Sequence, residues 1–303
     1  MTQGIFAVDK ESGLSSQAVL NRCKKQLKEK KIGHGGTLDP MASGVLVVAT
    51  GGCTRLLSYV MGAKKRYLAT FRLGITTDTY DITGKVISET DAGDVELCDL
   101  VVASGALRGE ILQVPPRYSA IHVQGKRAYD LARKGEIFEI PPRRAQVFEL
   151  KMDRAPDGLF TMYCEVSSGT YVRSLIHDLG QILGVGATMT DLTRLSVGDI
   201  DIEKASKVED LSAASALDPS TVFPSDLHLL VNEESTLVAI SNGRSIAADR
   251  IVPGDYREYD KVFLYESGIM SFDSLFAVVR VRDGLIVPMA VLQRKVASHV
   301  TES

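Results

Sequence analysis

Residues 33–50 read GHGGTLDPMASGVLVVAT, a glycine-rich loop that runs into a continuous apolar segment. Three glycines surround His34 and allow backbone angles or close approaches that side chains forbid. Asp39 precedes Pro40, and a residue before proline is biased toward an extended conformation. The apolar run over 45–49 is typical of a strand covered on both faces. The loop either holds Asp39 at the edge of a cleft or is an ordinary Asp-Pro turn.

The spacing of apolar residues on both sides of this loop predicts the other elements. In the helix expected over 95–107, Leu97, Leu100 and Val101 should face inward. Strands and helices mix without regular βαβ alternation, which predicts an α+β fold with a mixed, mainly antiparallel sheet flanked by helices. The expected strands are 5–9, 45–49, 67–75, 147–152, 160–166, 237–240, 262–264, 276–281 and 285–287, and the expected helices are 16–30, 95–107 and 170–183.

The length of 303 residues suits one sizeable domain with a small appendage. We expect the first domain to span 1–226 and a small β-rich domain to span 227–303, because short strand candidates and glycine turns fill the latter. Two Pro pairs enclose a basic stretch that predicts an excursion from the first domain over about 111–141. Its cations are Lys126, Arg127, Arg133 and Lys134.

Composition excludes several classes of protein. No apolar run approaches the roughly 20 residues that a membrane helix needs, and we expect no membrane association. The N-terminus lacks the pattern of a secretory signal, and the four cysteines form no CxxC or Cys/His pairing, so we expect a cytoplasmic protein. His34 has no second histidine nearby, which makes metal ligation an unattractive interpretation.

The net charge of −3 hides an uneven distribution. Residues 1–66 carry eleven Lys or Arg and four Asp or Glu, whereas the rest of the chain is acidic. The helix expected over 16–30 has lysines on much of its surface, which indicates either a solvated face or a phosphate-binding face. A polyanion is attracted by the local electrostatic field of a basic patch and not by the net charge of the chain. The net negative charge is therefore compatible with a localised nucleic-acid-binding site.

Four ordered blocks between residues 32 and 195 resemble the TruB family of tRNA pseudouridine synthases. They read GHGGTLDPMASGVL, KKRYLATFRLGITTDTYDITG, PPRYSAIHVQGKRAYDLARKGE and SSGTYVRSLIHDLGQILGVGATMTDLTRL. The resemblance implies the pseudouridine synthase fold with a PUA-like C-terminal domain. It also implies isomerisation of uridine 55 in the T-arm of tRNA, with neither a metal nor an organic cofactor.

By this resemblance, Asp39 in TLDP is the catalytic nucleophile, which attacks either C6 of the ring or C1′ of the sugar. Arg173 in GTYVR matches the arginine that pairs with the aspartate, and a guanidinium typically lowers a carboxylate pKa by roughly 1–3 units, which should offset desolvation. Tyr67 in KRY matches the tyrosine that stacks on the flipped uracil, and its hydroxyl is a candidate for removing the C5 proton.

The resemblance also assigns residues that bind the substrate. Leu192 matches an apolar wall of the base pocket, Tyr171 helps to shape it, and His34 fills the space that the flipped base vacates. Position 35 is glycine where many members carry Thr or Ala, which removes a side chain beside His34. We expect basic side chains to bind phosphates without reading sequence, namely Lys24, Lys25, Lys28, Lys64, Lys65, Arg66, Lys126, Arg127, Arg133 and Lys134.

Two other functions compete with this interpretation. A non-catalytic tRNA-binding or remodelling protein would share the basic surface, but it gains nothing from a desolvated carboxylate facing RNA. A guide-RNA-dependent relative acting on ribosomal RNA would need extra docking surface, and the chain has no long basic tail. We therefore expect an enzyme that acts without guide RNA, as a monomer.

Overall fold

The computed structural model describes residues 3–119, 121–123, 125–136, 138–251, 258–266 and 270–293. Its main feature is a nine-stranded sheet with the order β1-β3-β12-β4-β11-β10-β7, in which β2 also pairs with β3 and β13 with β12. Only β3 and β12 pair in parallel, so the expected mainly antiparallel sheet is confirmed. The strands are β1 Gly4–Lys10, β2 Ile32–His34, β3 Ser43–Thr50, β4 Lys65–Leu73, β7 Gly109–Gln113, β10 Arg143–Arg154, β11 Phe160–Val166, β12 Ala187–Val197 and β13 Ile200–Asp201.

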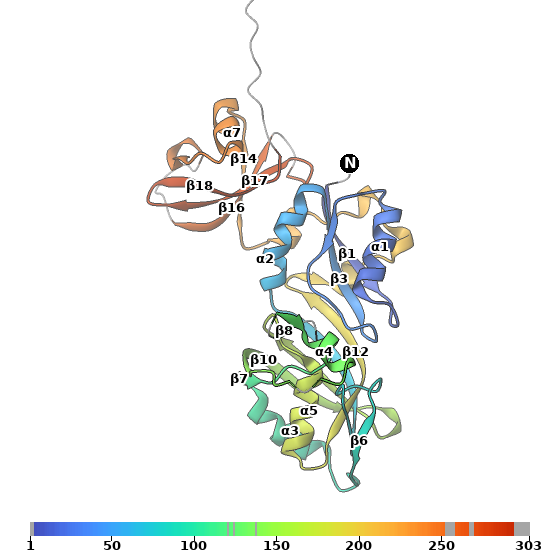
Figure 1. Ribbon diagram of the computed structural model, residues 1–303. Helices are drawn as coiled ribbons and strands as arrows, with labels where there is room; N and C mark the ends of the chain where they lie inside the picture. The colour runs from blue at the N-terminus through green and yellow to red at the C-terminus, as the bar shows by residue number, and fades with distance from the viewer. Residues whose placement is uncertain are drawn as a thin grey trace, which may run out of the picture.

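Strand β12 joins the two halves of this sheet, as Figure 1 shows, and it was not predicted. Its sequence, ATMTDLTRLSV, interrupts the apolar pattern with polar residues. The structure buries several of these, including Thr188, Arg194 and Ser196. Register shifts between Met189 and Asp191 and between Arg194 and Ser196 break the alternation further. A period-based prediction therefore has no signal to follow in this strand.

The helices of the first part are α1 Ser16–Gln26, α2 Leu57–Gly62, α3 Leu97–Ser104, α4 Ala128–Arg133, α5 Val172–Ile182 and α6 Pro219–Val222. Helix α1 ends at Gln26 and not near Lys30, because the backbone at Lys28 has a left-handed φ of 52° that ends helical geometry. In α3, Leu100 is fully buried as expected, but the prediction for Val101 is wrong, since 48% of it is exposed. Helix α5 buries Leu175, Ile176 and Leu179 as predicted.

A basic segment leaves the sheet between β7 and β10. It contains the short strands β8 His122–Val123 and β9 Lys126–Arg127, followed by α4. Residues 111–113, which we placed in the excursion, belong to β7 and pair with β10. We call residues 114–142 the insertion below. A second hairpin outside the main sheet joins β5 Ile75–Thr77 to β6 Val86–Glu89.

The second sheet has five strands in the order β14-β16-β17-β18-β15 and lies beside the N-terminal end of the molecule in Figure 1. Its elements are β14 Leu227–Val231, α7 Glu234–Ser241, β15 Ile246–Ala247, β16 Tyr259–Glu266, β17 Leu275–Arg282 and β18 Leu285–Val291. The strand expected over 237–240 is wrong: these residues belong to α7, which buries Leu237 and Ile240 one turn apart. The division at residue 226 remains a prediction.

The two sheets share one hydrophobic cluster, which we call the junction cluster. It contains Val45, Val47 and Ala49 of β3 together with Phe263 and Tyr265 of β16. Next to it, the Gln3 side chain donates a hydrogen bond of 2.8 Å to the Phe272 carbonyl. None of the helices in the described ranges is long and apolar enough to span a membrane.

Candidate functional site

A pocket of about 480 Å³ opens where the loop after β2 meets β4, β12 and the start of α5. The insertion covers one side of it through Tyr118 and Tyr129. Of the residues selected from the sequence, this pocket gathers Asp39, Lys65, Tyr67, Arg127, Tyr171, Arg173 and Leu192. Segments up to 158 residues apart in the chain therefore meet around one cavity, since its lining runs from Gly36 to Arg194.

The loop that carries Asp39 is fixed on both sides of the carboxylate. The Leu38 amide donates to the Ser16 hydroxyl at 2.8 Å, and that hydroxyl donates back to the Leu38 carbonyl at 3.1 Å. The buried Lys10 ammonium donates to the Pro40 and Ala42 carbonyls at 3.2 and 2.5 Å. Burial lowers the pKa of Lys10 to about 8, although the nearby charge of Asp39 opposes this. Asp39 thus sits on a rigid turn rather than on a free loop.

Arg173 lies between two carboxylates. Its Nε is 2.9 Å from Asp39 Oδ2 and its Nη2 donates to Asp39 Oδ1 at 3.1 Å, which is a two-point contact. Nη1 donates to Asp81 Oδ2 at 3.1 Å and to the Thr79 carbonyl at 3.1 Å. Nη2 also donates to the Tyr118 carbonyl of the insertion at 3.2 Å. With 5% of its side chain exposed, the guanidinium is locked in one orientation.

The environment of Asp39 acts on its charge in two directions. A third of the side chain faces the pocket, but protein surrounds the remainder, and this burial raises the pKa of Asp39. Arg173 opposes the shift, whereas the negative charge of Asp81 reinforces it. We expected the arginine to offset desolvation, but burial is the larger effect and the pKa of Asp39 lies above its ordinary value.

Tyr67 and Leu192 form the inner wall of the pocket. They come from the adjacent strands β4 and β12, and 7% and 5% of them are exposed. Burial raises the pKa of Tyr67, although the charge and hydrogen bond of Arg194 oppose this. The Tyr67 hydroxyl therefore stays protonated at neutral pH.

Tyr171 lies at the end of the sheet that faces the pocket, directly before α5. Its amide donates to the Gln113 side chain at 2.8 Å, and that side chain donates to the Tyr171 carbonyl at 3.0 Å. Because Gln113 belongs to β7, this exchange ties the start of α5 to the edge of the sheet. Burial raises the pKa of the Tyr171 phenol.

His34 ends β2, is half-buried and is not among the residues that line the pocket. Burial, and then the charge of Arg194, lower the pKa of His34, so the ring is neutral at neutral pH. Its Nδ1 is buried and has no hydrogen-bond partner in the described part of the chain. At Gly35, an added Cβ would approach Val60 Cγ1 to 3.2 Å. The packing of α2 thus takes the space that a side chain at position 35 would need.

The residues predicted to bind phosphates differ in their exposure and contacts. Lys64 is exposed, pairs with Glu165 at 3.1 Å and lies over the Phe148 ring. Lys126 and Arg127 are exposed on β9. The prediction for Lys65 is wrong, because its side chain is buried and its ammonium donates to the Met61 and Ala63 carbonyls at 2.9 Å each. The reason is the alternation of β4, which turns Lys65 to the same face as Tyr67.

Reasoning from the sequence missed two charged residues of the site. Asp81 holds Arg173 from the side opposite Asp39 and also accepts hydrogen bonds from the Thr79 and Thr83 hydroxyls. Arg194 lines the pocket while only 1% of it is exposed. Both lie inside the quoted blocks, but neither has a spacing that distinguishes it from a turn aspartate or a surface arginine.

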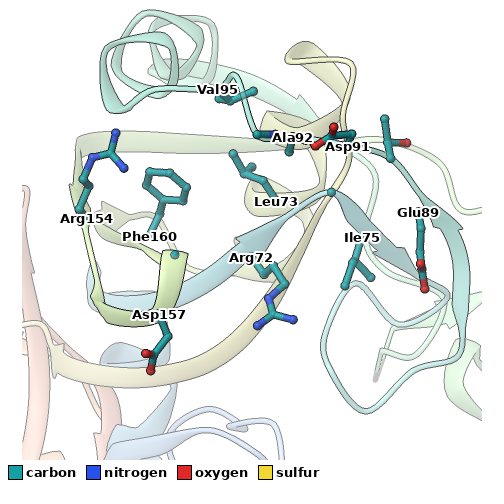
Figure 2. A pocket seen from close by; sticks show the side chains of 14 residues that line it. Arg72, Leu73, Ile75, Glu89, Asp91, Ala92, Val95, Arg154, Asp157 and Phe160 are labelled. Atoms are coloured by element: carbon teal, nitrogen blue, oxygen red, sulfur yellow. Dashed lines mark hydrogen bonds between the residues drawn. The ribbon is translucent and has the colours of Figure 1, made fainter.

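A larger cavity of about 720 Å³ lies at the other end of β4, and Figure 2 shows its side chains. Arg154 there pairs with Glu96, and the Asp91 side chain accepts a hydrogen bond from the Gly93 amide. The remaining lining brings no base next to a nucleophile, so its size alone does not make it a reactive site. Within the described ranges, no group of three or more His, Cys, Asp or Glu is arranged to hold a metal ion.

Comparison with protein families gives two adjoining matches. The profile described as TruB family pseudouridylate synthase (N terminal domain) matches residues 24–172. The profile described as tRNA pseudouridylate synthase B C-terminal domain matches residues 173–231. Together they include every site residue named above except Lys10 and Ser16.

Curated relatives and solved structures agree with these matches. The tRNA pseudouridine synthase B of Aquifex aeolicus is 36% identical over 294 residues, covering 95% of this chain and 99% of that protein. The protein of the same name from Mycobacterium tuberculosis is 40% identical over 252 residues, covering 81% and 84%. A chain in a crystal structure of a Cbf5-Nop10-Gar1 complex superposes with a TM-score of 0.71 at 25% identity, covering 97% of this chain and 86% of that one. The expected pseudouridine synthase fold is therefore confirmed.

Proposed function

Because this chain belongs to the TruB family of pseudouridine synthases and makes pseudouridine 55 in tRNA, we propose that it does so in the pocket at Asp39. One observation carries the assignment of the site. A carboxylate at the mouth of a cavity of about 480 Å³ is held in two places by a buried arginine. This volume accommodates a flipped nucleobase, and the carboxylate faces it from a turn that cannot move away.

Asp39 is the proposed nucleophile. Its ionised form attacks either C6 of the uracil or C1′ of the ribose, and the geometry is compatible with both. The role of Arg173 is to keep the carboxylate charged and to orient both of its oxygens. Since Arg173 also contacts Asp81, the charge of the guanidinium is shared between two anions. This sharing leaves Asp39 more reactive than a tightly neutralised carboxylate.

Tyr67 and Leu192 are proposed to enclose the flipped base. The Tyr67 ring stacks on the uracil and Leu192 extends the same wall beside it, while Tyr171 shapes the entrance. Because burial raises the pKa of Tyr67, its neutral phenol suits stacking better than removal of the C5 proton. His34 fills the gap that the extruded base leaves, as a neutral ring that costs little to place beside RNA bases.

The surrounding cations are proposed to bind the phosphates of the T-arm. Arg127 of the insertion lines the pocket, next to Lys126 on β9, while Lys64 is an exposed cation that directly precedes the pocket residue Lys65. Binding of this kind positions the RNA, whereas the loop shape and the displaced bases specify it. We propose that residues 1–226 form the catalytic domain with its insertion and that 227–303 form a PUA-like domain that supports tRNA binding.

We further propose that the enzyme acts alone, without guide RNA, as a monomer in the cytoplasm. The relatives that match over most of the chain are named tRNA pseudouridine synthase B, which supports action on tRNA directly. All four cysteines are free thiols, as a reducing compartment would keep them. A solved neighbour titled as an H/ACA RNP shares the fold at 23% identity, which is support for the architecture and not for a guide.

The test is to incubate purified protein with a T-arm hairpin and no added RNA or protein, and to map pseudouridine by mass-resolved sequencing. We expect product at the uridine equivalent to position 55. Asp39→Asn should give no product while its RNA affinity stays within a few-fold of the unmodified enzyme. If wild-type protein forms product only with a guide RNA, the stand-alone assignment is wrong. If Asp39→Asn still turns over, the assigned nucleophile is wrong.

A further inference from the structure

The pocket contains more buried positive charge than negative charge. Four nearly buried cations lie in or beneath it, namely Lys10, Lys65, Arg173 and Arg194, which are 0%, 6%, 4% and 1% exposed. Two carboxylates, Asp39 and Asp81, form ion pairs with this set in the described chain, and both pair with Arg173. Arg173 thus forms two ion pairs, whereas the cations on the other side of the pocket form none within the described ranges.

Arg194 is the clearest case of this imbalance. Its Nε donates to the Val45 carbonyl at 2.7 Å and its Nη2 to the Gly36 carbonyl at 3.3 Å, and both acceptors are neutral. Among the residues that the structure describes, none supplies a carboxylate within ion-pair distance of it. A guanidinium stays charged in proteins, so a lone buried one is costly unless an anion arrives.

Arg194 and Lys65 converge on one point of the pocket wall. Gly36 has a φ of 113°, and a Cβ added there would lie 3.8 Å from Arg194 Nη1 and 4.0 Å from Lys65 Cε. Arg194 is also the cross-strand partner of Tyr67, so its side chain lies on the face that bears the stacking ring. Burial, and then the charge of Arg194, lower the pKa of Lys65 to about 8. The two cations therefore form a positive wall beside Tyr67.

The reaction creates negative charge where this wall lies. When the N1–C1′ bond breaks, both bonding electrons stay with the uracil, which becomes an anion delocalised over its ring and carbonyl oxygens. In the route through C1′, the Asp39–C1′ bond forms as the N1–C1′ bond breaks, and C5 of the turned base then attacks C1′ with two ring electrons and displaces the carboxylate. The C5 proton passes to solvent and N1 takes up a proton, so the product is neutral. If Asp39 adds first to C6, the charge also passes to the base. Either route needs a cation near the base and not near Asp39.

We propose that Arg194, assisted by Lys65, supplies the positive charge that stabilises the uracil anion while the base is detached from the ribose. This inference rests on the proposed function of the pocket. It assigns a separate role to each arginine: Arg173 orients the Asp39 carboxylate and keeps it ionised, and Arg194 stabilises the negative charge on the leaving base. A fixed charge in a site that excludes water stabilises such an anion without reorganisation during the reaction.

The first test compares Arg194→Gln with Arg194→Lys in single-turnover reactions on the T-arm hairpin. We expect Arg194→Gln to slow the chemical step by about 100-fold or more, while the RNA dissociation constant changes by less than about threefold. Arg194→Lys keeps the charge and should recover most of the loss. Equal impairment of both variants, or a normal rate for Arg194→Gln, would overturn the proposal. Lys65→Met should slow the step by about tenfold and serves as the charge deletion if Arg194→Gln does not fold.

The second test needs no turnover. The hairpin carries 6-azauridine at the target position, whose ring N–H is more acidic than that of uridine, so the base becomes an anion as pH rises. Wild-type protein should bind this hairpin more tightly with rising pH, relative to the uridine hairpin, and Arg194→Gln should lose this dependence. Arg144→Gln, an exposed arginine paired with Glu110, is the matched control and should behave like wild type. The same pH dependence in Arg194→Gln would contradict the proposal even if pseudouridine is formed, whereas absence of product with wild type would refute the proposed function itself.

Discussion

At the scale of single residues, the fork of Arg173 is the contact that most directly controls the nucleophile. We predict that Arg173→Lys reduces turnover about 10–100-fold although the charge is kept, because one ammonium cannot reach both oxygens of Asp39 and also Asp81. Steady-state kinetics on the T-arm hairpin measure this loss, with the thermal midpoint as a check of folding. Near-normal turnover of Arg173→Lys would show that the two-point contact of Arg173 with Asp39 is not needed for catalysis.

The raised pKa of Asp39 has a consequence for the pH dependence of the reaction. The ionised carboxylate is the reactive form, so activity should fall as pH decreases through a pKa that lies above 3.8. Asp81 contributes to this shift, and its removal also leaves all of the Arg173 charge to Asp39. We predict that Asp81→Asn moves the acidic limb of the pH–rate profile to lower pH. An acidic limb that stays in place, or moves to higher pH, would contradict this electrostatic account.

Sequence patterns located part of the site, for a reason that is visible residue by residue. Asp39, Tyr67, Arg173 and Leu192 belong to short blocks whose resemblance to a family assigns them together, and the structure brings them to one pocket. Asp81 and Arg194 have no such individual mark. Their importance arises from contacts with residues far away in the chain, which neither charge nor periodicity encodes.

At the scale of elements, prediction succeeded where the buried residues are apolar and failed where polar residues are buried. Strand β3 and helix α5 follow their patterns closely. Strand β12 does not, because it buries Arg194 against neutral carbonyls, an arrangement that only the completed sheet allows. Helix α7 was mistaken for a strand, since its apolar run of four residues fits both periods.

The junction of β3 with β12 depends on Gly44. This residue has a φ of 95°, and an added Cβ would lie 2.3 Å from the Arg194 carbonyl oxygen. We predict that Gly44→Ala lowers the free energy of unfolding by about 3 kcal/mol, because strain and a backbone clash act together. Urea titration measures the change. Gly105→Ala is the matched control, with an ordinary φ and no heavy atom within 4 Å of the new Cβ, and it should be close to neutral.

At the scale of the whole molecule, an acidic protein binds a polyanion through local patches. Lys24, Lys25 and Lys28 are exposed around the end of α1, and none of them forms an ion pair within the described ranges. We predict that tRNA affinity falls steeply with salt and that changing all three to Gln lowers the slope of log K against log salt by about 2–3. Fluorescence anisotropy from 50 to 300 mM KCl, roughly the range in which such slopes are resolved, measures it. The change Arg144→Gln, which removes an exposed arginine paired with Glu110, should leave the slope intact. A tRNA affinity that does not change with KCl concentration would contradict binding by phosphate contacts.

The junction cluster makes the two sheets mechanically dependent on each other. Strand β3 starts one residue after Ala42, whose carbonyl Lys10 holds, and its buried side chains continue into the packing around Phe263 and Tyr265. A close-packed interior is stiff and transmits small displacements. Removing residues 227–303 would therefore expose the apolar side chains of β3, the strand that continues from the turn carrying Asp39. We expect the truncated protein to misplace the Asp39 carboxylate, and so to lose catalytic rate before it loses RNA affinity.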